Sequence, residues 1–250
     1  MKLSTFLSTL SLAYTALGVT FDSYTDSNDI TFWQGTWDTA IKGAKGNAQF
    51  GLALPPAAET GLTDEYIGRL VVPKTTDGTW LGLSHTSGMT TNLLLVTWLD
   101  GDKVKTSFRY ASDYVAPNIY IGNATLSTIS QSSNATHYEI TYRCEGCWMW
   151  SQDGVDGSQI PATTASAAQI VGWAQATVAP ANPGNADSGI RQHAAEGAFA
   201  ATVASARNSG YTKWTSLATA APTGVPSGTP PSNGTASPTG SATATSSSAP

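Results

Sequence analysis

Short apolar runs separated by turn residues form the main pattern of the chain. The run at residues 50–54 ends at a Pro-Pro pair, and the run at residues 66–72 ends at a further proline. Residues 104–110 alternate between apolar and polar side chains, which is typical of a strand with one buried face. Many short strands, regular turn signals and few helical periods predict an all-β fold, an antiparallel β-sandwich of the immunoglobulin-like kind.

Residues 194–208 are the part of the chain whose structure this pattern leaves open. The stretch is rich in alanine and resembles a helix, yet residues 197–203 also suit a strand followed by a short helical turn. Periodicity does not distinguish the two, so both alternatives are kept.

The first residues have the features of a secretory signal peptide. Lys2 supplies the positive charge, residues 3–17 are mostly apolar or small, and Ala16-Leu17-Gly18 is a suitable cleavage site. The apolar run is too short and too polar to span a bilayer, and no other segment is a transmembrane candidate. We therefore predict that residues 1–18 are removed and that the mature protein is secreted, extracellular and free of membrane.

Residues 218–250 differ in composition from the rest, being almost entirely Ser, Thr, Pro, Ala and Gly without charge or aromatic ring. Such a segment cannot bury enough apolar surface to offset its chain entropy. We expect a disordered, O-glycosylated segment. It is either a linker to a further module that is missing or a tail that never led to one. Residues 19–217 remain, a length suited to one β-domain.

Charge and composition disfavour several functions. The formal net charge is −5 and only 12% of residues are charged, so the chain offers no basic surface to nucleic acid. It lacks the Gly-x-Ser-x-Gly turn of a serine hydrolase. A glycosidase needs two facing carboxylates, whereas the acidic residues here are scattered and expected mainly at the solvated surface. They are Glu59, Asp64, Glu65, Glu139 and Glu145. We expect a monomer.

Cys144 and Cys147 are the two cysteines of the chain, in a Cys-x-x-Cys arrangement. Covalent haem attachment would need a histidine after the second cysteine, where Trp148 stands. A thioredoxin-like site needs a βαβ context, and a zinc site needs two further ligands. In a secreted chain the pair is therefore predicted to form a disulfide.

Three Asn-x-Ser/Thr sequons provide further surface markers. They lie at Asn123, Asn134 and Asn233. We predict that these asparagines are glycosylated and exposed.

Met89 and His193 carry the most informative chemistry. Each lies just before an apolar segment, so each is expected in a loop at a strand edge. A thioether and an imidazole can fill both axial positions of a haem iron, which gives an electron carrier with no free coordination position. Taken alone, such residues are more often a core filler and a hydrogen-bonded histidine. With both loops at one end of a sandwich, the porphyrin would lie at the domain edge, and Gly88 would allow its close approach.

An ordered series of motifs strengthens this interpretation. In chain order they are Phe50-Gly51-Leu52-Ala53-Leu54-Pro55, Trp80-Leu81-Gly82-Leu83, Gly88-Met89, Arg109-Tyr110-Ala111-Ser112-Asp113-Tyr114-Val115, Tyr142-Arg143-Cys144-Glu145-Gly146-Cys147, Trp173-Ala174 and Gln192-His193. From about Phe21 to Ser209 the chain thereby resembles the cytochrome domain of fungal cellobiose dehydrogenases, a haem b-binding β-sandwich of the DOMON type.

The resemblance implies a role for each site residue. Met89 and His193 would be the axial ligands of haem b, and Tyr114 would hydrogen-bond a haem propionate. The Cys144–Cys147 disulfide matches the family, whereas His85 and His137 match no ligand. One departure is that the sequence after His193 has fewer aromatic residues than the family's strand there.

The resemblance also implies a function. The chain has no Gly-x-Gly-x-x-Gly fingerprint after a strand, so the family's flavin domain has no counterpart in it, and we expect no catalysis by the chain alone. It would relay single electrons from an extracellular sugar-oxidising flavin dehydrogenase to a copper polysaccharide monooxygenase, a quinone or ferric iron. The alternative is a haem-free carbohydrate-binding module in which some of the eight tryptophans stack on sugars.

Overall fold

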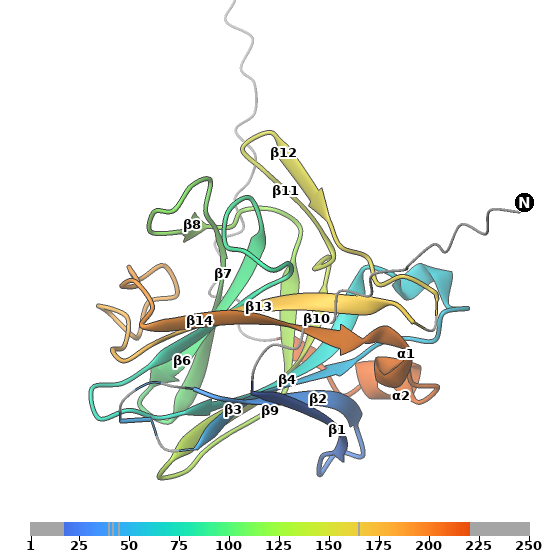
Figure 1. The fold of residues 1–250 in the computed structure, drawn as a ribbon, viewed down its shortest axis with the longest axis horizontal. Coiled ribbons are helices and arrows are strands. Elements are labelled where there is room, and N and C mark those ends of the chain that lie inside the picture. The colour runs from blue at the N-terminus through green and yellow to red at the C-terminus, as the bar shows by residue number, and fades with distance from the viewer. Residues whose placement is uncertain (1–17, 40, 42, 45, 165, 221–250) are drawn as a thin grey trace, which may run out of the picture.

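Two antiparallel β-sheets face each other and enclose the main core (Figure 1). The computed structural model describes residues 18–39, 41, 43–44, 46–164 and 166–220. Within these residues, one sheet has seven strands in the order β1-β2-β3-β4-β10-β9-β15, and the other has six in the order β14-β13-β5-β6-β7-β8. The predicted all-β antiparallel sandwich is confirmed.

The strands are short and joined mainly by turns and loops. The seven-stranded sheet contains β1 (Val19–Thr25), β2 (Thr31–Asp38), β3 (Asn47–Ala53), β4 (Glu65–Pro73), β9 (Thr125–Ser133), β10 (His137–Glu145) and β15 (Thr219–Ala220). The six-stranded sheet contains β5 (Trp80–Ser84), β6 (Leu93–Asp100), β7 (Lys103–Tyr110), β8 (Asn118–Ile119), β13 (Ala168–Ala176) and β14 (Ala195–Thr202). A hairpin of β11 (Met149–Gln152) and β12 (Val155–Ser158) projects from one end of the sandwich, at the top of Figure 1.

Helices are few and short: η1 (Thr60–Leu62), α1 (Val203–Ala206) and α2 (Tyr211–Thr215). The stretch that the sequence left open is thus strand β14 followed by the single turn α1, the second of the two alternatives. Phe199 and Ala201 alternate into the core, which explains why the alanine-rich segment forms a strand here. Tyr211 and Trp214 of α2 pack with Phe32 and cover part of the outer face of the seven-stranded sheet.

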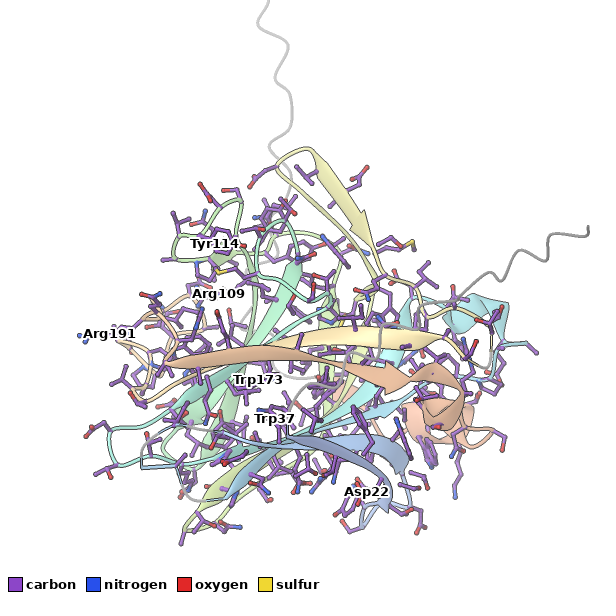
Figure 2. All side chains as sticks on the ribbon, in the orientation of Figure 1. Asp22, Trp37, Arg109, Tyr114, Trp173 and Arg191 are labelled. Carbon is purple, nitrogen blue, oxygen red and sulfur yellow. A yellow bond between two sulfur atoms is a disulfide. The ribbon has the colours of Figure 1, made fainter. Side chains whose placement is uncertain are left out.

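The main core lies between the sheets. Leu81 and Leu83 of β5 and Leu95 of β6 pack there against residues of the seven-stranded sheet. Trp37 of β2 and Trp173 of β13 meet across the gap with ring centroids 5.3 Å apart, and Figure 2 shows them between the two layers. Every second residue of β5 faces this core, so the residues between them face the other side of the sheet.

The two predicted terminal segments lie largely outside the described residues. Of the predicted signal peptide only Gly18 is described, and of the predicted tail only residues 218–220. Thr219 and Ala220 pair with β9 as strand β15, so the sheet extends beyond residue 217. In the part of the chain that the structure describes, no helix is long and apolar enough to cross a membrane.

Cys144 and Cys147 form a disulfide at the end of β10, and both are fully buried. Gly146, between them, has a φ of +69°, a conformation that glycine adopts without strain. Its N–H donates to the carbonyl oxygen of Asp64 at 2.8 Å. The disulfide and this hydrogen bond fix the turn that leads into the β11–β12 hairpin.

Glu65 corrects the expectation that the acidic residues lie mainly at the solvated surface. Its side chain is buried, and Arg143 Nη2 lies 2.6 Å from its Oε2 and 3.0 Å from Glu145 Oε1. The neighbouring Asp64 accepts a hydrogen bond from the N–H of Trp148 at 2.6 Å, while burial raises the pKa of its carboxyl. These carboxylates therefore hold the fold rather than a substrate.

His85 is buried between the sheets, with both ring nitrogens hydrogen-bonded. Nδ1 lies 2.8 Å from the carbonyl oxygen of Leu93, and Nε2 lies 2.9 Å from the hydroxyl of Tyr66. Burial lowers the pKa of His85 to about 4, because the charged ring would lose its hydration. The histidine is therefore neutral across the physiological range.

We predict that His85 makes stability fall in mild acid. Its pKa is 6.5 in the unfolded chain and about 4 in the folded one, so the unfolded chain takes up the proton first. The stabilisation is fully present above pH 6.5 and is lost as the pH falls toward 4, by about 3 kcal/mol in total. Urea denaturation across this range should show the loss in the wild type and a smaller one in His85→Gln. His137→Gln is the control, and an identical loss in His85→Gln would contradict the prediction.

Candidate functional site

Met89 lies in the loop that joins β5 to β6. The loop is held by its own backbone and by neighbouring strands: Asn92 Nδ2 donates to the carbonyl oxygen of Gly88 at 2.9 Å, and Thr91 N–H donates to that of Ala111 at 2.7 Å. The Met89 side chain is half-buried. The loop therefore has a defined course that places a thioether near the sheet surface.

Gly172 of β13 holds the Met89 loop against the sheet. Its N–H donates to the carbonyl oxygen of Thr86 at 2.6 Å. A Cβ at Gly172 would lie only 2.8 Å from that oxygen, closer than real side chains come. By contrast, a Cβ at Gly88 would meet no atom within 4 Å, so no described atom of the protein requires a glycine there.

His193 lies in the other loop, residues 177–194 between β13 and β14. The next residue, Ala194, donates its N–H to the carbonyl oxygen of Gln175 at 2.8 Å. His193 Nε2 lies 3.1 Å from Glu196 Oε2, and the Glu196 side chain is 68% exposed. An exposed ion pair of this kind contributes little, so the imidazole can turn to another partner at small cost.

Arg109 of β7 holds the loop of His193 in place. It is buried, and its Nη2 donates to the carbonyl oxygens of Ala186 at 2.7 Å and Ser188 at 2.8 Å. Trp98 Nε1 donates to the carbonyl oxygen of Pro183 at 2.8 Å. Sequence reasoning gave Arg109 no role; the signal was an arginine between Phe108 and Tyr110, on the face of the strand opposite to these core residues.

The loop of residues 177–194 covers one face of the six-stranded sheet, the face turned away from the main core. Trp80, Val96 and Trp98 form a cluster on this face, and Ala174 and Ile190 pack against it. The Met89 loop follows the last residue of β5, whereas Gln175, which anchors His193, pairs with Leu81 near its first residue. The loop of residues 177–194 runs back along the sheet from there, because Arg109, which pairs with Leu94 near the start of β6, binds its carbonyl oxygens at Ala186 and Ser188. The expectation that both loops lie at one end of the sandwich stays a prediction.

The donor atoms of the two loops suit a haem iron. A thioether and an imidazole tied only to an exposed carboxylate are ligands that can be supplied from the two loops. The indole N–H of Trp80, on the sheet face under the loop of residues 177–194, is buried without a hydrogen-bond partner among the described residues, as expected where a bound group would supply an acceptor. His85 is not available as a ligand, since both of its nitrogens are occupied in the core.

The remaining predicted site residues lie at the surface. Tyr114 is 80% exposed, and Figure 2 shows it on the same side of the molecule as Arg109 and Arg191. Asn123 and Asn134 are exposed, as sequons require, and Asn233 lies outside the described residues. The prediction that Tyr114 contacts a propionate stays a prediction.

The burial of the tryptophans disfavours a sugar-binding surface. None of the eight is exposed: six are buried, and Trp33 and Trp173 are half-buried and pack against the core. A stacking platform for carbohydrate needs an open ring face, which these side chains do not offer.

Two antiparallel sheets around one core, with a thioether and an imidazole in two of the loops, define an all-β sandwich domain. The family model for the cytochrome domain of cellobiose dehydrogenase matches residues 24–213. The chain belongs to this family, and the predicted resemblance is confirmed. Membership of a cytochrome family implies haem binding and electron transfer.

Relatives agree with this assignment. The pyrroloquinoline quinone-dependent pyranose dehydrogenase of Coprinopsis cinerea is 34% identical over 177 residues, which is 70% of this chain and 23% of that protein. The chain thus spans less than a quarter of the length of this relative.

Two solved structures share the fold. The cytochrome domain of Myriococcum thermophilum cellobiose dehydrogenase is 33% identical, with a TM-score of 0.72 over 81% of this chain and 98% of that one. The cytochrome b domain of pyranose dehydrogenase from Coprinopsis cinerea is 28% identical, with a TM-score of 0.63 over 80% and 96%.

We predict that Gly172→Ala displaces the Met89 loop, because the new methyl group meets the Thr86 carbonyl oxygen at 2.8 Å. The clash should lower the free energy of unfolding by about 1–3 kcal/mol, measured by urea denaturation. Gly88→Ala is the matched control, with open space around its Cβ, and should stay close to the wild type. Equal effects of the two substitutions would show that the contact does not constrain the loop.

Proposed function

We propose that residues 19–217 form a haem b-binding electron-transfer domain with Met89 and His193 as axial ligands. When bound, a haem with these two ligands supplies a reversible one-electron couple at raised potential with no free coordination position. The observation that carries the proposal is the match of residues 24–213 to the cytochrome-domain family, together with an apolar sheet face under the loop of residues 177–194. Tyr114 is the proposed propionate partner.

Each element of the chain has a task in this proposal. Gly172 and Arg109 fix the course of the two loops, so the thioether and the imidazole are positioned before any group binds. Trp80 and Val96 exclude water from the face. We further propose that residues 1–18 direct secretion and that the segment after strand β15 serves as a linker or tail.

The proposed partners follow from the family, whose relatives include a cellobiose dehydrogenase and a pyranose dehydrogenase. The donor is an extracellular sugar-oxidising flavin dehydrogenase; a pyrroloquinoline quinone-dependent sugar dehydrogenase is a second class of donor, suggested by the curated relative. The acceptors are a copper polysaccharide monooxygenase, a quinone or ferric iron. The chain itself performs no substrate chemistry.

The ligand pair can be tested by absorption spectroscopy of the full chain supplied with haem b. The wild type should give a low-spin spectrum with sharp bands when reduced. His193→Ala and Met89→Leu should lose the haem or give a high-spin spectrum, since each removes one axial donor. His137→Ala, which removes a half-buried histidine of the other sheet, should keep the wild-type spectrum.

Two outcomes would contradict this assignment. A wild type that stays colourless with haem, and is retained on cellulose, would support the carbohydrate-binding alternative. A His193→Ala variant with an unchanged low-spin spectrum would show that another residue is the ligand. Far-UV circular dichroism of each variant separates loss of haem from loss of fold.

Electron transfer can be tested by stopped-flow mixing of the oxidised protein with a flavin sugar dehydrogenase. We expect reduction of the bound haem only when enzyme and sugar are both present, and reoxidation on addition of a quinone or a copper monooxygenase. His193→Ala is the control that lacks the couple. Failure of every donor to reduce a correctly ligated wild type would reject the relay function while leaving the ligand assignment intact.

A further inference from the structure

A second pair of residues with redox chemistry lies inside the sandwich, in the main core between the two sheets rather than on the face of Met89 and His193. The hydroxyl of Tyr66 lies 2.9 Å from His85 Nε2. Tyr66 is 1% exposed and His85 is 3% exposed, so water does not separate them. The two side chains therefore form a direct hydrogen bond that is shielded from water.

The direction of that hydrogen bond follows from the partners. The carbonyl oxygen of Leu93 can only accept, so His85 Nδ1, at 2.8 Å, carries the ring proton. Nε2 of the neutral ring is then an acceptor, and the Tyr66 hydroxyl donates to it. Tyr142 Oη, 3.4 Å from Tyr66 Oη, donates to Tyr66 in turn. Tyr66 thus faces a base that is free to take its proton.

Two other buried tyrosines lack such a base. Tyr138 donates its hydroxyl proton to the carbonyl oxygen of Thr97 at 2.8 Å, and Tyr120 donates to the amide oxygen of Asn123 at 3.0 Å. Neither oxygen takes up a proton at neutral pH. Among these tyrosines, Tyr66 is the one whose proton has a destination.

Aromatic rings surround Tyr66 and continue through the core. The Trp148 ring centroid lies 4.7 Å from that of Tyr66. On the other side, successive centroid distances of 6.4, 6.1, 5.4 and 5.3 Å link Tyr66 to Phe50, Phe199, Trp37 and Trp173. An electron can therefore leave Tyr66 through close contacts, although the residue itself is buried.

We propose that Tyr66 is a redox-active residue that is oxidised by one electron in a step coupled to proton transfer to His85. A strong outer-sphere one-electron oxidant accepts the electron. The Tyr66 O–H bond breaks, its proton forms a new N–H bond at His85 Nε2, and a neutral tyrosyl radical remains beside the imidazolium. Return of the electron and the proton restores both residues. Without the base, a phenol radical cation would have to form, and this species is a far stronger acid than an imidazolium.

Flash photolysis of the full chain with ruthenium(II) tris-bipyridine and a sacrificial quencher tests the proposal. Samples frozen after the flash are examined by electron paramagnetic resonance, with ring-deuterated tyrosine to identify the radical. When haem is present, its iron is oxidised beforehand, so the organic radical is read independently of the proposed haem site. We expect a tyrosyl signal in the wild type and in Tyr138→Phe, and its loss in Tyr66→Phe.

Two further variants separate redox chemistry from a structural role. Tyr142→Phe removes a hydroxyl from the same cluster without touching the base, and should keep the signal. His85→Gln retains a hydrogen-bonding side chain that takes no proton, and should lose the signal although Tyr66 is present. Thermal unfolding of each variant checks that it folds.

The wild type alone supplies an independent measurement. Electron-nuclear double resonance in deuterated buffer should show a strongly coupled exchangeable proton, contributed by the His85 N–H at the shorter distance, and the coupling should persist in Tyr142→Phe, which lacks the other exchangeable proton near Tyr66 Oη. A full signal in Tyr66→Phe or in His85→Gln, or a wild-type radical without this coupling, would overturn the proposal. The coupling is measured on the wild type, so the proposal can be refuted even if a variant does not fold.

Discussion

The loops that carry Met89 and His193 depend on hydrogen bonds from strand residues of the six-stranded sheet to their main-chain carbonyls. Gly172 N–H binds the carbonyl oxygen of Thr86, and the guanidinium of Arg109 binds that of Ser188. A carbonyl packed on an apolar face and cut off from water costs free energy unless it finds a donor, so donors fixed in strands decide where the loops run. The positions of Met89 and His193 follow from this constraint, because each lies within a few residues of an anchored carbonyl or N–H.

His85 connects the base of the Met89 loop to the main core. Its ring accepts from Tyr66, while its Nδ1–H and its backbone N–H, at 2.8 and 3.2 Å, both donate to the carbonyl oxygen of Leu93. These two bonds close the base of the segment from residue 85 to residue 93, which carries Met89. A buried neutral histidine costs stability in acid, but here it joins the two strands from which the ligand loop starts. His85 thus closes the Met89 loop and also accepts the hydrogen bond of a hydroxyl buried in the core.

The strands and the family could be predicted because their signals are local. Alternating runs and turn residues mark β4, β5 and β6, and the ordered motifs carry the likeness. The arrangement of the site was harder, since it depends on register: Gln175 pairs with Leu81, and its carbonyl oxygen binds the N–H of Ala194 next to His193. The roles of His85 and Arg109 were not predictable. Their partners, Tyr66 at a separation of 19 residues and Ser188 at 79, are adjacent only in the folded chain.

The two sites share one loop but use different atoms of it. Proton transfer from Tyr66 uses His85 Nε2, whereas closure of the loop uses His85 Nδ1 and the backbone N–H. Oxidation of Tyr66 would convert the ring to imidazolium, in which Nδ1 keeps its proton and its bond to Leu93 becomes charge-assisted and therefore stronger. The loop that carries Met89 would remain closed during that step. The geometry thus allows one-electron chemistry in the core without releasing the loop that carries the thioether.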